Sequence, residues 1–208
     1  MSKLSQTITF GSLTPITYSL NGTLSLTGTA SSNLTVSYVS SNTSIATIAG
    51  STLTIVKAGT INITASQEGD ATYDPATNVV QELVINKANQ TITFNTLSNL
   101  TYSNGGTSAL GATSSSGLTV SYSSSVTAVA TVNGSTLTIV KAGSTVITAS
   151  QAGNDNYNDA TSVTQTQVVD KANQTITFAV LSNLSYSNGG TSALGAYSSS
   201  GLGITYSS

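Results

Sequence analysis

Apolar and hydroxyl-bearing residues alternate one by one along several short stretches of this chain. Residues 7–10 read Thr-Ile-Thr-Phe, and a similar alternation returns at residues 35–38 and 52–55. A period of two residues is the period of a half-buried strand, so each stretch predicts a β-strand with one apolar face and one hydroxyl-bearing face. No helix is expected. Further strands are predicted at residues 24–30, 45–48, 61–65 and 79–85.

Turn-forming pairs separate these predicted strands. Asn21-Gly22, Ala49-Gly50 and Ala58-Gly59 each place a residue that tolerates a turn conformation between two alternating stretches. About seven short strands within one unit of the chain are typical of a two-sheet sandwich of the immunoglobulin type. The sequence therefore predicts an all-β fold.

The pattern is copied along the chain with a fixed spacing. The pentapeptide Gln-Thr-Ile-Thr-Phe begins at Gln6, Gln90 and Gln174, which gives a period of 84 residues (90 minus 6, and 174 minus 90). Residues 51–59 return unchanged as residues 135–143. A unit copied without insertions predicts tandem structural modules. We therefore expect immunoglobulin-like sandwiches in an extended array.

The period divides the chain into four parts. We expect a lead-in at residues 1–5, repeats at residues 6–89 and 90–173, and an incomplete repeat at residues 174–208. The third repeat has 35 of its 84 residues (208 minus 173) and lacks the strands that should cover its apolar face. A fragment below about 40 residues seldom folds alone. Two explanations stay open, namely a polypeptide that continues past Ser208 and a neighbouring subunit that donates the missing strands.

The junctions between repeats are short and polar. Residues 86–89 and residues 170–173 each connect the last strand of one repeat to the first strand of the next. Neither junction resembles a flexible linker rich in Gly and Ser. The sequence therefore predicts a stiff or gently twisted rod. Freely bending junctions are the alternative that the sequence leaves open.

Residues 36–65 and 120–149 share a longer signature. Each segment contains Val-Ser-Tyr, then Ala-Thr followed by a Gly and Leu-Thr, and ends on Ile-Thr-Ala. These segments resemble the core of the bacterial immunoglobulin-like domains, and the likeness extends over nearly the whole chain. The resemblance implies tandem sandwiches of the kind found in surface adhesins, invasin-like stalks, secreted enzymes and phage virion proteins. It implies no shared catalytic residues, so it supports an architecture rather than an activity.

Composition excludes several classes of function. The chain has no Cys, His, Trp or Arg, so thiolate nucleophiles, Ser-His pairs and the usual zinc, copper and haem ligands are absent from the sequence. A Ser-Lys pair at Lys57 or Lys141 has no pocket signal beside it, and we expect no enzyme and no cofactor. A net charge of -2 offers no basic face for nucleic acid. No segment approaches the roughly 18 apolar residues of a membrane span, so we expect no membrane insertion.

One loop is a candidate calcium site. Residues 68–74 in the first repeat correspond to residues 152–159 in the second, and both loops are rich in oxygen-bearing side chains. The spacing does not match an EF-hand loop, and Asp or Asn beside Gly is also typical of Asx-turns with an inward-packed Tyr. Turn formation is thus the competing interpretation. The candidate calcium ligands are Asp70, Asp74, Asp155 and Asp159.

Carbohydrate or host-receptor binding is the rival class of function. Sugar sites usually present an exposed aromatic platform flanked by amides and carboxylates, but most aromatic residues of this chain recur at repeat positions and are expected in the core. Tyr197 breaks the repeat by replacing Thr113. A single non-repeating Tyr does not by itself define a sugar site.

Together these observations predict a structural or adhesive stalk that projects from an extracellular surface. Its expected partners are other protein subunits of a virion or bacterial surface assembly, with a cell-surface glycan or receptor as the alternative. Residues 1–5 lack the apolar stretch of about 7 to 15 residues found in secretory signals. Virion proteins are released by lysis and need no such signal, which favours a phage fibre or decoration protein over a bacterial surface protein.

Overall fold

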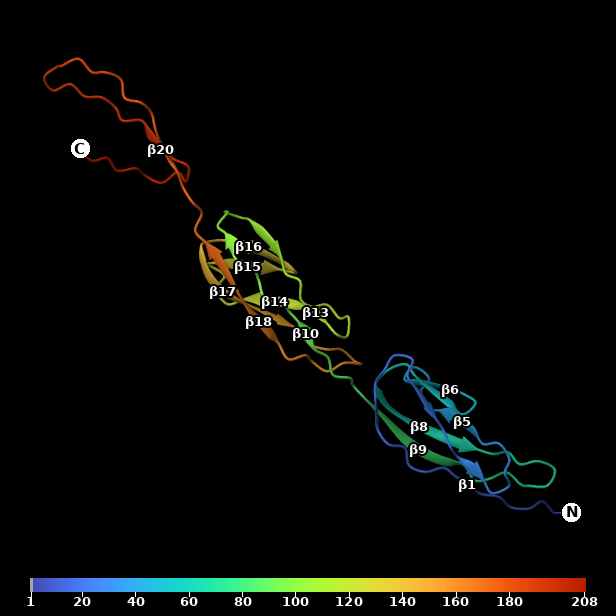
Figure 1. Cartoon of the computed structure of the whole chain (residues 1–208). Coiled ribbons are helices and arrows are strands. Elements are labelled where there is room, and N and C mark those ends of the chain that lie inside the picture. Colours follow the sequence, from blue (N-terminus) through green and yellow to red (C-terminus); the bar gives the residue numbers. More distant parts are fainter. Residues whose placement is uncertain (1) are drawn as a thin grey trace.

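The computed structural model describes residues 2–208 as an extended array of all-β units (Figure 1). Two immunoglobulin-like β-sandwiches follow one another along the long axis of the molecule, and a third, open segment follows them. No helix that could span a membrane occurs in the described part of the chain. The predicted fold class is confirmed.

The first sandwich is built from three small sheets. Strands β2, β9, β8 and β5 form a four-stranded sheet, β3, β7 and β6 form a three-stranded sheet, and β1 pairs with β4. All pairs are antiparallel except β2 with β9, which are parallel. The strands are β1 (Ile8–Thr9), β2 (Ile16–Thr17), β3 (Thr23–Ser25), β4 (Thr29–Ala30), β5 (Ser37–Ser40), β6 (Ala46–Ala49), β7 (Thr52–Ile55), β8 (Gly59–Ser66) and β9 (Val79–Asn86).

The second sandwich repeats this topology. Ile92 pairs with Ser114 just as Ile8 pairs with Ala30, so the register is shifted by the 84-residue period. The sheets are β11-β18-β17-β14, β12-β16-β15 and β10-β13. The strands are β10 (Ile92–Thr93), β11 (Leu100–Thr101), β12 (Thr107–Ala109), β13 (Thr113–Ser114), β14 (Ser121–Ser124), β15 (Ala130–Asn133), β16 (Thr136–Ile139), β17 (Gly143–Ser150) and β18 (Val163–Asp170).

The alternating residues fill the interior of each sandwich. Leu53, Ile63 and Leu83 have no exposed surface in the first core, and Leu137 and Ile147 have none in the second. The neighbouring Thr52 and Thr136 are exposed, where a β-branched side chain with a hydroxyl suits a wet strand surface. Each sandwich therefore has its own apolar core, as the period of two predicted.

One predicted strand is wrong. Residues 24–30 form two strands rather than one, because β3 pairs with β7 whereas β4 pairs with β1. The break lies at Gly28, whose N–H donates to the hydroxyl of Tyr38 at 2.6 Å instead of to a neighbouring strand. The two-residue parallel strand β2 was also not among the predicted segments, since two residues are too few to show an alternation. Each sandwich therefore has nine strands rather than about seven.

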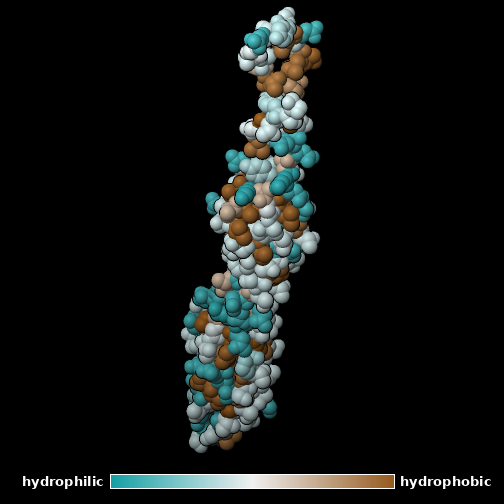
Figure 2. Space-filling view, turned by 90° about the vertical axis from the view of Figure 1, so that its left-hand side faces the viewer, coloured by the Kyte–Doolittle hydropathy of each residue, from teal (hydrophilic) through white to brown (hydrophobic). Residues whose placement is uncertain are grey.

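The third segment keeps only the first pairing of a repeat. Strand β19 (Ile176–Phe178) pairs with β20 (Ala196–Ser198) in the register of β10 with β13. Ile176 and Phe178 are 64% and 49% exposed, whereas the equivalent Ile92 and Phe94 are 8% and 6% exposed. Figure 2 shows apolar side chains gathered at this end of the molecule. The repeat boundaries at residues 5, 89 and 173 stay a prediction.

Candidate functional site: the joint between the first two repeats

Residues 151–158 form a compact loop closed by its own backbone and side chains. The Oδ1 atom of Asn154 accepts hydrogen bonds from the backbone N–H groups of Asn156 and Tyr157, at 2.8 and 2.9 Å. The N–H of Asn154 in turn donates to the carbonyl of Tyr157. This is the Asx-turn that Asn beside Gly favours. We call residues 151–158 the joint loop.

Gly153 is required by the shape of the joint loop. Its φ of +71° lies in the left-handed region, and a Cβ atom there would lie 2.3 Å from the carbonyl oxygen of Tyr157. A residue with a side chain would force that carbonyl to move. The Gly in this loop is therefore a packing requirement as well as a turn former.

The Gln that opens the repeat fixes the joint loop to the sandwich. Gln90 is buried, and its Nε2 donates at 2.7 Å both to Oε1 of Gln151 and to the carbonyl of Asn158. Its own Oε1 accepts a hydrogen bond from the hydroxyl of Ser116. Buried amides need such partners, because an unpaired polar group inside a protein is costly. The joint loop is therefore held in place by its own repeat, independently of its contacts with the first repeat.

Tyr157 carries the joint loop onto the end of the first sandwich. Its ring packs edge to face against Tyr18, with centroids 5.6 Å apart and an interplanar angle of 83°. Tyr157 belongs to the set of side chains that contact the core of the first repeat, and Tyr18 beneath it is 7% exposed. The inward packing predicted for this Tyr is thus wrong in its direction, since Tyr157 packs onto the preceding repeat.

Three polar contacts link the joint loop to residues 57, 58 and 87. The N–H of Ala58 donates to Oδ1 of Asn156 at 3.0 Å, and Nζ of Lys87 donates to the carbonyl of Asn154 at 2.7 Å. Nζ of Lys57 lies 2.7 Å from Oδ2 of Asp155 in the one ion pair of residues 2–208. A hydrogen bond from Lys57, together with the charge of its ammonium group, holds the pKa of Asp155 below the ordinary value of 3.8. Apolar and charged contacts therefore join the two repeats at the same place.

The junction itself is part of the joint. The N–H of Ala88 donates to the carbonyl of Asn156, and the N–H of Asn158 donates to the carbonyl of Ala88, both at 2.9 Å. These two bonds form a short parallel bridge between Ala88 and Tyr157. The junction that looked like a connector in the sequence is thus paired with the joint loop through its backbone.

The equivalent loop of the first repeat has the same internal structure. Oδ1 of Asp70 accepts from the N–H groups of Thr72 and Tyr73, at 2.7 and 2.8 Å. These N–H groups, that of Tyr73 more than that of Thr72, lower the pKa of Asp70. Leu4 pairs with Tyr73 in the same parallel bridge that joins Ala88 to Tyr157. The predicted lead-in at residues 1–5 therefore takes the place of a junction in its described part.

The structure does not gather the four calcium candidates into one group. Asp70 uses one oxygen on its own turn, and Asp155 faces Lys57. The backbone of Asp74 pairs with Leu4, and Asp159 lies in an open groove beside the joint. In residues 2–208 no three acidic side chains lie close enough together to hold a metal ion. The calcium hypothesis stays a prediction for experiment.

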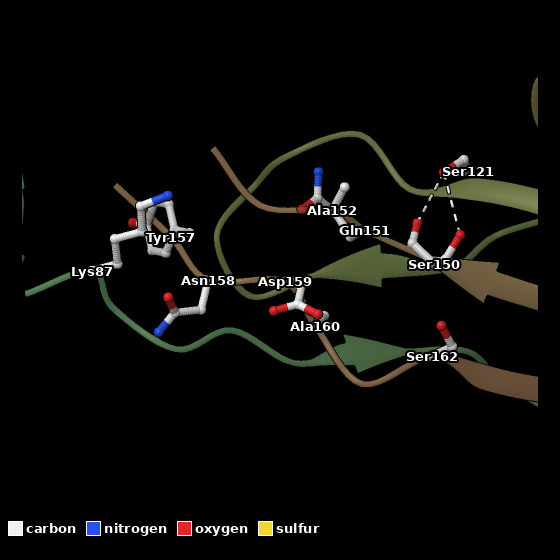
Figure 3. A pocket seen from close by; sticks show the side chains of 10 residues that line it. All are labelled: Lys87, Ser121, Ser150, Gln151, Ala152, Tyr157, Asn158, Asp159, Ala160 and Ser162. Atoms are coloured by element: carbon white, nitrogen blue, oxygen red, sulfur yellow. Dashed lines mark hydrogen bonds between the residues drawn. The ribbon is translucent and has the colours of Figure 1, made fainter. Parts of the chain in front are cut away.

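An open groove of about 570 Å³ runs from the joint along the second sandwich. Figure 3 shows Lys87 and Tyr157 at one end, Ser150 and Ser162 at the other, and Asp159 between them. Two groups that could recognise a sugar are used internally, because Gln151 accepts from Gln90 and the amide of Asn158 donates to Asn89. The non-repeating Tyr197 lies in β20, in the third segment, far along the chain from this groove.

Sequence reasoning missed the role of Lys57 and of Tyr18. From the sequence, Lys57 was considered as a member of a possible Ser-Lys pair, and Tyr18 was assigned no contact. The signal was present in the repeat, since Tyr18, Lys57 and Lys87 recur as Tyr102, Lys141 and Lys171. A recurring Lys and Tyr in a chain with five Lys residues favours a shared contact, but the sequence does not say which residues meet.

Comparisons with known proteins agree on fold alone. No family model matches the chain, and no curated protein matches it either. The chain is similar to Drosophila N-cadherin EC1-4, at 12% identity and a TM-score of 0.38 over 82% of this chain and 50% of that one. It is similar to Sidekick-1 immunoglobulin domains 1-5, at 13% identity and a TM-score of 0.35 over 80% of this chain and 40% of that one.

A third similar structure is that of domains 1-6 of the surface layer protein SbsC. The identity is 19% and the TM-score is 0.32, over 83% of this chain and 29% of that chain. This chain therefore spans half or less of the length of these three structures. Likeness at this level concerns tandem sandwiches and carries no argument about function.

Proposed function

We propose that this chain is a non-enzymatic stalk. It holds successive sandwiches at a fixed angle and sets how far the protein at its outer end stands from the surface that carries it. The observation that supports this proposal is the joint, where Tyr157 of one repeat packs on Tyr18 of the preceding one. A short connector alone would let the two sandwiches rock. A connector that is paired along its backbone and flanked by a ring contact and two Lys contacts resists bending in more than one direction.

The stalk works by geometry rather than by chemistry. The longest strands of each repeat have eight residues, and the repeats follow one another along the long axis. The length of the stalk therefore grows in proportion to the number of repeats. Stiff joints keep that reach, because a flexible chain of the same length folds back on itself. Avidity follows when several stalks are displayed side by side.

The proposed setting is extracellular, on a virion or a bacterial cell surface, with other protein subunits of that assembly as partners. The likeness of residues 36–65 and 120–149 to the bacterial immunoglobulin-like domains supports this setting, and a phage fibre or decoration protein is the version that we favour. Immunogold labelling with an antibody against the chain distinguishes the settings. Label on particles favours the virion, label on intact cells favours the bacterial surface, and label only inside cells contradicts both.

The stiffness of the joint is directly measurable. The chain has no Cys, so the double substitution Thr47→Cys and Thr131→Cys places one spin label at equivalent exposed positions of each complete repeat. Pulsed electron resonance should give one narrow distance distribution. The same pair of labels with Tyr157→Ala should give a broader one. An equally broad distribution in both proteins contradicts the stalk proposal.

Binding of a glycan or host receptor is the second candidate function. The groove beside the joint supports it, because this groove is concave and holds the carboxylate of Asp159 between its two ends. A glycan array probed with the whole chain tests this function. Binding that is lost in Asp159→Ala but kept in Ser162→Ala would support recognition at this groove, and no binding across the array would leave the stalk as the function.

A further inference from the structure

A second groove, of about 690 Å³, lies at the far end of the second repeat, where the third segment begins. We call it the open socket. It is concave, partly apolar and flanked by two ammonium groups. Its lining includes Tyr102, Lys141, Ala142, Lys171, Ala172 and Gln174.

Each of these six residues has a counterpart 84 positions earlier in the joint between the first two repeats. The counterparts are Tyr18, Lys57, Ala58, Lys87, Ala88 and Gln90. All six contact the joint loop: one by ring packing, one by an ion pair, and the others by hydrogen bonds. The open socket therefore has the counterpart of each of these six contact groups. Its groove lies at the position equivalent to the one that the joint loop fills between the first two repeats.

The second repeat has the backbone geometry of the first at this end. The N–H of Tyr102 donates to the carbonyl of Asp170 at 2.8 Å, just as that of Tyr18 donates to the carbonyl of Asn86 at 2.8 Å. Strand β11 pairs with β18 in the register of β2 with β9. The two ends differ in the exposure of the Tyr. Tyr18 is buried beneath the ring of Tyr157, whereas Tyr102 has no such ring over it among the described residues and is half-buried.

We propose that the open socket binds a loop of the same kind as residues 151–158, supplied by a completed third repeat. This inference deepens the stalk proposal and rests on it, since it states how a third repeat is joined. A Tyr ring of that loop packs on Tyr102, and its Asx-turn carbonyl accepts from Lys171. Where the loop carries a carboxylate at the position of Asp155, this group pairs with Lys141.

The hydrogen bonds of the opening Gln identify the third repeat as the source of this loop. Gln6 bonds to Gln67 of its own repeat, and Gln90 bonds to Gln151 of its own repeat. Gln174 retains only the Ser200 contact of this set among the described residues. A loop that belongs to the repeat opened by Gln174 satisfies that amide and the socket together.

A second copy of this chain offers a poorer match. The loop that it presents freely is residues 68–74 of its first repeat, which has Ala71 where the joint loop has Asp155 and Thr72 where it has Asn156. That loop therefore lacks both the carboxylate for Lys141 and the amide oxygen for the N–H of Ala142. The exposed face of β19, with Ile176 and Phe178, also needs the strands of its own repeat rather than a loop alone.

The test uses the whole chain with residues 174–208 replaced by a copy of residues 90–173. Spin labels at Thr131→Cys and at the same Thr in the copy report on the new joint. We expect one narrow distance distribution, which Lys141→Gln or Tyr102→Ala broadens. Lys57→Gln, at the other joint, is the matched control and should leave this distribution unchanged. In thermal unfolding, Tyr102→Ala should lower the midpoint of the third repeat by about 4–8 °C.

Three results would overturn the proposal. The first is a third repeat that folds but gives a broad distance distribution across the new joint, which Lys141→Gln does not change. The second is a copied repeat that does not fold, because the same sequence folds beside the first repeat. The third is self-association of the 208-residue chain in sedimentation that depends on both Tyr73 and Lys141, since it would assign the socket to a second copy. If the first result is obtained while the distance distribution between the first two repeats stays narrow, the stalk proposal stands and only this inference is wrong.

Discussion

The rings of Tyr18 and Tyr157 are 139 positions apart in the sequence (157 minus 18) and meet edge to face with centroids 5.6 Å apart. Edge-to-face packing places the positive edge of one ring on the negative face of the other. This contact joins two separate cores, because Tyr18 belongs to the first and the loop of Tyr157 is fixed to the second. The angle between the repeats is thereby tied to the packing of two side chains.

A double-mutant cycle measures this contact. Tyr18→Phe keeps the ring and serves as a mild reference, whereas Tyr18→Ala and Tyr157→Ala each remove one ring. We expect a coupling free energy of about 0.5–1.5 kcal/mol between the two Ala substitutions in urea unfolding. Tyr73→Ala removes the equivalent ring of the first repeat and is the matched control. A coupling near zero would show that the rings touch without stabilising the joint.

The ion pair between Lys57 and Asp155 predicts a pH dependence of the joint. The pKa of Asp155 is lower in the folded chain than its ordinary 3.8, so the folded state holds this proton more weakly than the unfolded state. The contribution of the pair is therefore present above about pH 3.8 and is lost as the pH falls through the folded value. Both side chains are largely exposed, at 45% and 76%, so the effect is small and is weakened by salt.

Label distances between the first two repeats, followed from pH 6 to pH 2.5, check this expectation. The distribution should broaden at low pH in the parent protein and change less in Lys57→Gln. Lys141→Gln removes the equivalent Lys, which forms no ion pair with the described residues, and should behave as the parent does. A pH response that is the same in all three proteins would assign it to other groups.

Gly153 predicts a local loss of stability. Gly153→Ala places a Cβ atom 2.3 Å from the carbonyl oxygen of Tyr157 at a φ of +71°. We expect the second repeat to lose about 1–3 kcal/mol of unfolding free energy, together with a broader joint. Gly111→Ala is the control, because its Cβ atom would meet open space. Equal stability of the two variants in urea unfolding would contradict the required role of Gly153.

The buried Gln90 should matter more for stability than its equivalent, Gln174, in the third segment. Gln90→Ala leaves the side chain of Gln151 and the carbonyl of Asn158 without this partner, which should cost about 1–3 kcal/mol of unfolding free energy. Gln174→Ala, the equivalent change in the third segment, removes a contact with Ser200 and no other side-chain hydrogen bond to residues 2–208. It should be close to neutral in urea unfolding of the 208-residue chain. A comparable loss in both variants would mean that Gln90 acts through its contact with Ser116, which corresponds to the contact between Gln174 and Ser200, rather than through the joint loop.

Calcium should not stabilise the chain. Asp70 uses an oxygen on two backbone N–H groups and Asp155 faces Lys57, so neither presents a free set of oxygens to a cation. We expect the same melting temperature in calcium and in chelator. A saturable rise in melting temperature with calcium that is lost in Asp70→Asn or Asp159→Asn would contradict this expectation and establish a calcium site.

The sequence by itself determined the fold class and the period. A period of two residues gives a strand one buried face whatever its neighbours are, and the copied pentapeptide at Gln6, Gln90 and Gln174 places the repeats without any structure. The loop around Tyr157 was also visible, because Asn beside Gly closes a turn through contacts a few residues apart. These features depend on local sequence, which explains why they could be predicted.

Only the tertiary structure decided which residues meet across the joint. Tyr18, Lys57 and Tyr157 come from three separate segments of the chain, and no periodicity says that they converge. The division of residues 24–30 between two sheets was likewise hidden, because it depends on the hydroxyl of Tyr38 reaching the N–H of Gly28. Long-range contacts are set by how complete sandwiches pack. Their identity therefore follows from three-dimensional geometry and not from the order of residues.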